Sequence, residues 1–146
     1  GGTSGMFFFL LLAMLSKSFL EAINYIEHYG LVRERGKPIE MRHSWNSNHC
    51  ISSLYLCNVT RHSDHHRASN LKFWELNACD ESAPTLPYGY LGMLYLLLIT
   101  PFLYRRIMVK KIIDWDLNYA NEQERELANV QIRNSGYKGR KYIISR

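Results

Sequence analysis

The sequence predicts an all-α, membrane-associated fold with a helical, histidine-rich cap on the cytoplasmic side. Two apolar runs without a single charge, "GMFFFLLLAML" (residues 5–15) and "YGYLGMLYLLLITPFLY" (residues 88–104), indicate membrane contact. The segment between them is polar and contains "HSDHH", whose spacing of three and four residues places the imidazoles on one face of a helix. The net charge of +5 suits contact with anionic lipid headgroups, and no nucleic-acid-binding motif is present.

The first apolar run is long enough to span a bilayer only if its helix continues beyond Lys17. About 20 apolar residues are needed, so we expect a transmembrane helix over residues 5–29 that stops at Gly30. No positively charged segment precedes the run, as a secretory signal would require. Because the chain opens on "GGTSG" without an initiator Met, we expect it to be the C-terminal part of a longer protein.

The second apolar run, residues 88–104, has basic residues on both sides. Arg105, Arg106, Lys110 and Lys111 follow it, and several arginines precede it within residues 30–87. The positive-inside rule assigns both flanks to the cytoplasm. We therefore expect an interfacial or re-entrant helix that Pro101 kinks or ends. A crossing helix remains the alternative.

The remaining segments are expected to lie in the cytoplasm. Within the His-box region, residues 30–87, we expect a turn at "RERGKP" and a helix over 61–68, whereas residues 43–60 have no clear pattern. Residues 105–146 form a tail in which 113–130 has the apolar spacing of one surface helix, followed by a basic end. The three cysteines are odd in number and lack C-x-x-C spacing, as in reduced cytoplasmic thiols.

The histidines are the candidate functional residues. His62, His65 and His66 can converge, and neutral imidazoles are ligands for iron, zinc, copper or nickel. A solvated polar helix that happens to contain histidines is the alternative. "NYIEHYG" at residues 24–30 places His28 where the apolar helix leaves the membrane, and ionisable residues at that depth tend to mark function.

Four motifs, "NYIEHYGL", "HSWNSN", "RHSDHH" and "LPYGYLGM", resemble in order and spacing the C-terminal part of the integral-membrane alkane 1-monooxygenases, non-haem diiron enzymes of the fatty-acid-desaturase-like superfamily. The resemblance is strong over residues 20–93 and continues more weakly to about residue 136. An isolated H-x-x-H-H would also fit a desaturase, whereas "HYG" and "HSWNSN" are typical of alkane and xylene hydroxylases. Val59–Thr60 and Arg67 depart from the usual pattern without removing a ligand-type residue.

The resemblance implies a membrane helical bundle, of which this chain would be a fragment, and a set of site residues. The implied iron ligands are His28, His62, His65 and His66, and the candidates for orienting their imidazoles are Asn24, Glu27 and Asp64. For His43 and His49, which lie outside these ligand motifs, we expect a structural role or one that orients a ligand, rather than metal ligation. The two earlier histidine boxes of that family do not occur in this chain, so we expect an incomplete site and no turnover by the chain alone.

The resemblance also implies a reaction: terminal hydroxylation of a medium-chain alkane with O2 at two irons, with electrons from rubredoxin and its reductase. The expected location is a bacterial inner membrane, with the histidine boxes in the cytoplasm. A membrane fatty-acid desaturase or hydroxylase and a xylene-type monooxygenase are alternatives within the superfamily. A non-enzymatic, membrane-anchored metal-binding module is the alternative outside it.

Overall fold

The computed structural model describes residues 2–79 and 81–135, and its regular secondary structure over these ranges is helical throughout. The elements, in order, are α1 (Gly2–His28), the 3-10 turn η1 (Met41–His43), α2 (Cys50–Tyr55), α3 (His62–Arg67), α4 (Tyr90–Ile99), α5 (Pro101–Asn118) and α6 (Glu122–Ser135). An isolated bridge joins Asn46 to Thr85. The predicted all-α class is confirmed, whereas residues 136–146 of the predicted basic tail lie outside the described residues.

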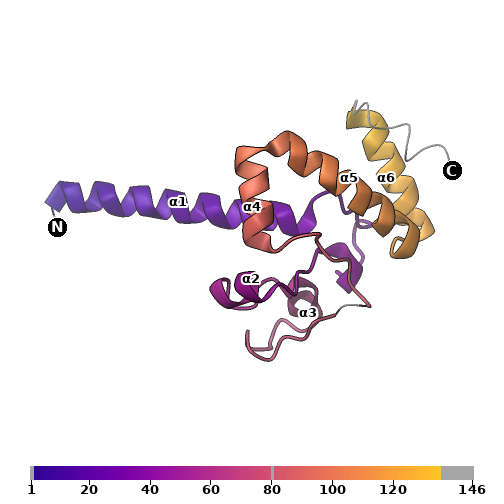
Figure 1. Cartoon of the computed structure of the whole chain (residues 1–146), viewed down its shortest axis with the longest axis horizontal. Helices are drawn as coiled ribbons and strands as arrows, with labels where there is room; N and C mark the ends of the chain where they lie inside the picture. Colours follow the sequence, from indigo (N-terminus) through magenta and orange to yellow (C-terminus); the bar gives the residue numbers. More distant parts are fainter. Residues whose placement is uncertain (1, 80, 136–146) are drawn as a thin grey trace.

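Helix α1 projects away from the other helices (Figure 1). Its 27 residues extend about 40 Å, which exceeds the ~30 Å hydrocarbon core of a bilayer. The apolar side chains from Met6 to Leu15 are exposed, and burial begins only at Ile23. Of the helices in the described part of the chain, α1 has the length and composition for crossing a membrane. It ends where predicted, with Gly30 at a φ of +73°.

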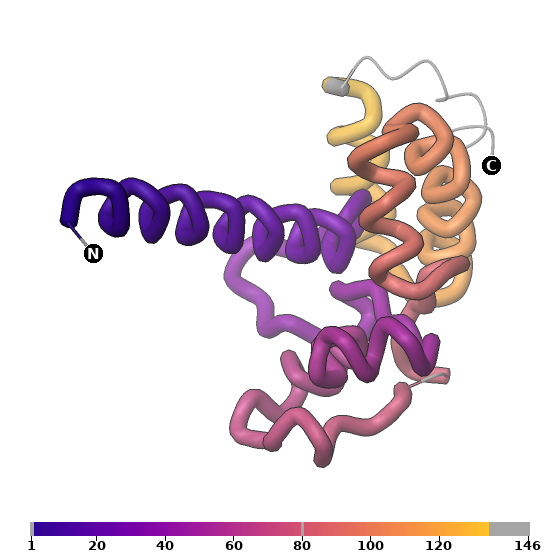
Figure 2. Tube along the Cα trace, turned by 60° about the vertical axis from the view of Figure 1, so that its left-hand side comes forward, coloured from indigo at the N-terminus to yellow at the C-terminus, as the bar shows by residue number. Residues whose placement is uncertain are grey.

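The second apolar run divides at Thr100 into α4 and the start of α5. Pro101 is the first residue of α5, where its missing N–H costs no helical hydrogen bond. The expectation that this proline ends the apolar helix is confirmed. The ten residues of α4 extend about 15 Å, half of what a span requires. In both views α4 runs across the C-terminal end of α1 rather than alongside it (Figures 1 and 2).

The single helix predicted over residues 113–130 is wrong, because the chain breaks between α5 and α6. The N–H groups of Tyr119 and Ala120 both donate to the carbonyl of Trp115, which closes α5. Asn121 then begins α6: its side-chain oxygen accepts the N–H of Glu124 at 2.8 Å, and the Glu124 carboxylate accepts the N–H of Asn121 at 3.0 Å. This reciprocal capping pattern of polar residues three apart is visible in the sequence.

The core surrounds the segment of residues 41–47, which links the helices to one another. Two tryptophans and a tyrosine anchor it: Trp115 Nε1 donates to the carbonyl of Arg42 at 2.6 Å, Tyr90 donates to the carbonyl of Trp45 at 2.6 Å, and Trp45 Nε1 donates to the carbonyl of Tyr29 at 2.9 Å. All three rings are fully buried. The segment is thereby held against the end of α1.

Candidate metal centre

Two helices bring three histidines together. His28 is the last residue of α1, and His62 and His66 lie one turn apart on α3. One nitrogen from each ring lies within 4.8 Å of the other two. The ring centroids of His62 and His66 are 4.3 Å apart, and that of His28 lies 5.1 and 5.5 Å from them. We refer to His28, His62 and His66 as the histidine cluster.

The backbone determines which nitrogen His28 presents to the cluster. Its Nδ1 lies 3.0 Å from the carbonyl oxygen of His43, and because a carbonyl only accepts, Nδ1 carries the proton. Nε2 therefore keeps its lone pair, and it lies 3.3 Å from Nε2 of His62. Two nitrogens bound to one ion at ~2.1 Å are ~3.0–3.4 Å apart at octahedral or tetrahedral angles. The spacing fits two ligands of one metal ion.

Buried polar atoms at the cluster lack hydrogen-bond partners. Nε2 of His66, Nδ1 of His62 and Oε1 of Glu27 have none among the described residues. Native proteins leave few such atoms unsatisfied, and each calls for a water, an ion or a functional reason. Oε1 of Glu27 lies 3.4 Å from Nδ1 of His62, near enough to orient that ring after a small rotation. The unpartnered nitrogen of His66 fits a bound cation, and Nδ1 of His62 fits a hydrogen bond to Glu27.

The cluster favours neutral imidazoles. Burial, together with the nearby rings of His66, His28 and His65, lowers the pKa of His62 to about 3. Burial and the adjacent histidines also lower the pKa of His66. At neutral pH both rings therefore offer a lone pair without having to release a proton, as metal coordination requires.

The fourth predicted ligand, His65, stands apart from the cluster. Its ring is exposed on α3, with its centroid 6.0 Å from that of His62 and 6.2 Å from that of His66. His49 is exposed where α2 begins. His43 is buried and bonded at both ring nitrogens, which is the structural role expected of it. The structure thus assembles three of the four predicted ligands.

Of the three residues expected to orient imidazoles, Glu27 lies against the cluster. Asn24 is exposed on α1. Asp64 is fully buried, but its carboxylate accepts from Arg67 at 2.8 Å and from the N–H of Asn77 at 2.8 Å rather than from an imidazole. The backbone carbonyl of His43 orients the ring of His28. This acceptor was missed, since a backbone acceptor leaves no trace in the residue pattern.

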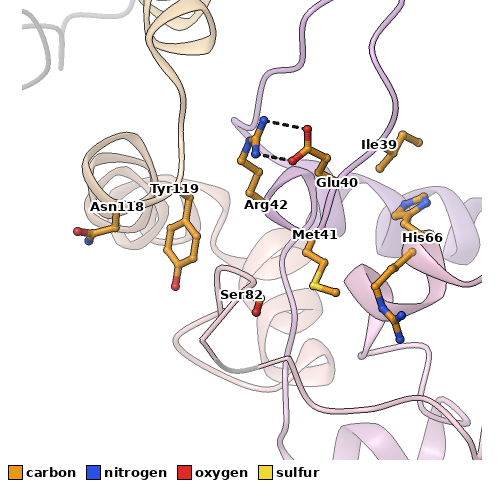
Figure 3. Close-up of a pocket in the computed structure, with 9 residues that line it drawn as sticks. Ile39, Glu40, Met41, Arg42, His66, Ser82, Asn118 and Tyr119 are labelled. Carbon is orange, nitrogen blue, oxygen red and sulfur yellow. Dashed lines mark hydrogen bonds and ion pairs between the residues drawn. The ribbon is translucent and has the colours of Figure 1, made fainter.

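One cleft is lined by a cluster histidine, and a second lies beside the cluster at Glu27. His66 lines a polar cleft together with Glu40, Arg42 and Tyr119, and Figure 3 shows the Glu40–Arg42 ion pair in its wall. The second cleft, which we call the α1 groove, is mainly apolar and includes Glu27. Its lining residues are Phe19, Leu20, Glu21, Ile23, Asn24, Glu27, Leu56 and Val59.

Comparison with known proteins identifies similar sequences. A family described as fatty acid desaturase matches residues 1–97. Alkane 1-monooxygenase 1 of Pseudomonas aeruginosa is 42% identical over 127 residues, which cover 84% of this chain and 32% of that protein. The xylene/toluene monooxygenase hydroxylase component XylM of Pseudomonas putida is 36% identical over 124 residues, 85% of this chain and 33% of that protein. The chain spans about a third of the length of these relatives.

Proposed function

The chain belongs to the fatty acid desaturase family, and from that premise we propose that it is part of a membrane monooxygenase that hydroxylates the terminal carbon of a medium-chain alkane with O2. The observation that carries the proposal is the histidine cluster at the end of an apolar helix. His28, His62 and His66 would hold iron, with His65 reaching a second iron that ligands outside this chain complete.

The substrate explains why a redox metal is needed. A saturated C–H bond offers no acidic proton to a base and no electrophilic carbon to a nucleophile, so residues alone cannot functionalise it. The overall reaction is R–CH3 + O2 + 2 e⁻ + 2 H⁺ → R–CH2OH + H2O. Bound iron would supply the O2-derived oxidant. The neutral imidazoles hold the metal without cancelling its charge.

The apolar residues of α1 are proposed to guide the alkyl chain. Phe19, Leu20 and Ile23 line the α1 groove, which also includes Glu27, 3.4 Å from a ring nitrogen of His62. A hydrocarbon dissolved in the bilayer could follow these side chains toward the cluster without crossing water. The groove thus places an apolar path beside the proposed metal.

The exposed basic residues are proposed to receive the electron donor. Arg33, Arg35 and Lys37 are exposed on the loop after α1, and the positive charge of Arg33 is near enough to influence the pKa of His66. Such a surface steers an acidic protein toward it. We propose rubredoxin, reduced by its reductase, as the donor on the cytoplasmic face of a bacterial inner membrane.

A desaturase is the second candidate, because the matched family is described as fatty acid desaturase. It would use the same ligand set on an acyl chain and introduce a double bond. A xylene-type monooxygenase would hydroxylate a methyl group on an aromatic ring. A non-enzymatic metal-binding module would need only the histidine cluster and would contain zinc without iron.

Product analysis on the complete polypeptide that contains this segment distinguishes these candidates. Membranes carrying it are supplied with rubredoxin, its reductase, NADH and, in parallel, n-octane, p-xylene or an acyl substrate. We expect octan-1-ol and bound iron. His66→Ala should abolish the alcohol, whereas His49→Ala, which removes an exposed imidazole, should retain it. Formation of an unsaturated acyl product alone would assign the chain to a desaturase, and zinc without iron would exclude both enzymes.

A further inference from the structure

A buried carboxylate outside the histidine cluster is connected to it by two successive hydrogen-bonded contacts. We infer that Glu124, on α6, is a positioning residue for the metal centre: through His43 it sets the orientation and tautomer of His28. The inference rests on the proposed function, in which His28 is a metal ligand. It assigns α6 a role in positioning His28, in addition to the histidines themselves.

The first contact joins Glu124 to His43. Glu124 is 1% exposed and His43 is 6% exposed, and Oε1 of the carboxylate lies 2.6 Å from Nε2 of the imidazole. The other ring nitrogen of His43, Nδ1, accepts the N–H of Glu40 at 2.9 Å. Because Nδ1 is an acceptor, the proton resides on Nε2, which donates to the carboxylate. The ring is thus held at both nitrogens.

The carboxylate is itself held in place. Its Oε2 accepts from Nε of Arg42 at 3.1 Å and from the N–H of Asn121 at 3.0 Å. The first bond comes from a charged guanidinium. The second comes from the residue that caps α6, so the carboxylate is fixed relative to that helix. Glu124 therefore transmits the position of α6 to the imidazole of His43.

The second contact joins His43 to His28. The carbonyl oxygen of His43 accepts the Nδ1–H of His28 at 3.0 Å. The neighbouring backbone is anchored on both sides, since the carbonyl of Arg42 accepts from Trp115 and the N–H of Trp45 donates to the carbonyl of Glu27 at 2.8 Å. In the inference, the side chain of His43 limits the remaining freedom of this turn, and with it the direction of the carbonyl.

Without the carboxylate of Glu124, the ring of His43 and the turn that carries its carbonyl would no longer be fixed. The Nε2–H of His43 would lose its acceptor in a buried site, and the ring would have to turn toward another one. The carbonyl would follow, and His28 could then adopt the tautomer that puts a proton on Nε2. Partners that orient a ligand imidazole typically contribute 10- to 100-fold to metal affinity. For a partner acting through a second residue we expect about tenfold.

A double-mutant cycle on metal binding tests the inference. The complete polypeptide is purified without metal, and its apparent Kd for Fe²⁺ is measured anaerobically by competition with a chelator, without substrate or O2. The variants are Glu124→Ala, His28→Ala and the two combined. Glu126→Ala, which removes an exposed acid from the same helix, is the control and should leave the Kd unchanged.

We expect Glu124→Ala to raise the Kd about tenfold and to have no further effect once His28 is already alanine. A purely structural role would instead weaken binding to the same extent in both backgrounds, and that outcome overturns the inference, as does an unchanged Kd in Glu124→Ala. If Glu124→Ala does not fold, Glu124→Gln takes its place in the cycle, with a smaller rise expected because one acceptor oxygen remains. A normal Kd in His28→Ala would instead refute the ligand assignment itself.

Discussion

The three rings of the histidine cluster differ in how firmly neighbouring polar groups fix their orientation. His28 is fixed by a backbone carbonyl, and Nδ1 of His62 faces Glu27 at 3.4 Å. Nε2 of His66 is buried without a hydrogen-bond partner in the described part of the chain. Of the three, His66 therefore gains the most from a metal, since a metal bond would satisfy an otherwise unpaired atom.

The separation of His65 from the cluster leads to a prediction about iron stoichiometry. In the complete protein, His66→Ala should lose the iron held by the cluster, because the cluster keeps only two of its three nitrogens. His65→Ala should retain that iron and lose a second one, since the His65 ring lies about 6 Å from its neighbours and faces solvent. Elemental analysis of purified protein provides the measurement. Two irons retained in His65→Ala would exclude His65 as a ligand.

Asp64 leads to a prediction about stability and pH. Burial raises its pKa, but the N–H of Asn77 and the guanidinium of Arg67 outweigh burial, and the net shift is downward from 3.8. A carboxyl whose pKa is depressed by folding stabilises the protein fully above its unfolded-state pKa and loses that effect as the pH falls through the folded-state value. Asp64→Asn should therefore cost roughly 2 kcal/mol at pH 7.

That difference should shrink below about pH 4, where the carboxyl is protonated first in the unfolded state and, at lower pH, in the folded state. Thermal unfolding in detergent at a series of pH values measures it. If the difference in unfolding free energy between the wild type and Asp64→Asn stays constant down to pH 3, the charge of Asp64 does not stabilise the contact between Asn77 and α3.

At the level of elements, the turn after α1 determines where His28 lies relative to α5. Gly30 has a φ of +73°, and a Cβ at this position would clash with the side chain of Ile112 on α5. With Ile112 in this position, the close approach of these two elements leaves no room for a side chain. It also places the start of the 31–40 loop against the same helix that anchors Arg42 through Trp115.

Gly30→Ala should destabilise the protein by about 2–3 kcal/mol, through both the positive φ and the clash. Gly36→Ala is a matched control, because Gly36 also has a positive φ, +85°, but open space around it. It should cost only about 1 kcal/mol. Urea unfolding in detergent compares the two. If both substitutions lower the free energy of unfolding equally, the side chain of Ile112 moves aside, and the contact between α5 and the turn after α1 accepts a Cβ.

At the level of the whole molecule, the placement of α4 across the end of α1 relates the fold to the membrane. If α1 crosses the bilayer, α4 lies across its end and therefore near the plane of the interface (Figure 2). Its exposed side chains, Tyr95, Leu98 and Ile99, continue into Phe102 and Leu103 at the start of α5. Exposed basic residues follow immediately at Arg105 and Arg106, as in a helix that rests on anionic headgroups.

This arrangement predicts that the segments on either side of α4 share one compartment. In protein whose three native cysteines are replaced by serine, cysteines introduced at the exposed positions Lys37 and Gln131 should both react with a membrane-impermeant maleimide from the cytoplasmic side alone. Labelling of inside-out and right-side-out vesicles is the measurement. Reaction from opposite sides would mean that residues 88–104 cross the membrane.

The sequence by itself determined the helical class, the extent of α1, the break at Pro101 and the identity of the candidate metal ligands. These features depend on local properties, namely an unbroken apolar run, a residue that lacks an N–H, and imidazoles three and four positions apart on one helix. The separation of α5 from α6 was also encoded locally, in the Asn121–Glu124 cap, but the apolar spacing of residues 113–130 concealed it.

Only the tertiary structure decided which histidines meet and what holds them. His28 reaches His62 because residues 41–47 fold between α1 and α3, and His65 is excluded because its place on α3 leaves its ring exposed and farther from its neighbours. The contacts of Glu124 with His43, and of the His43 carbonyl with His28, join residues far apart in the chain, one of them through a backbone atom. Sequence patterns report which groups are present, whereas such partners depend on where the packed helices place each group.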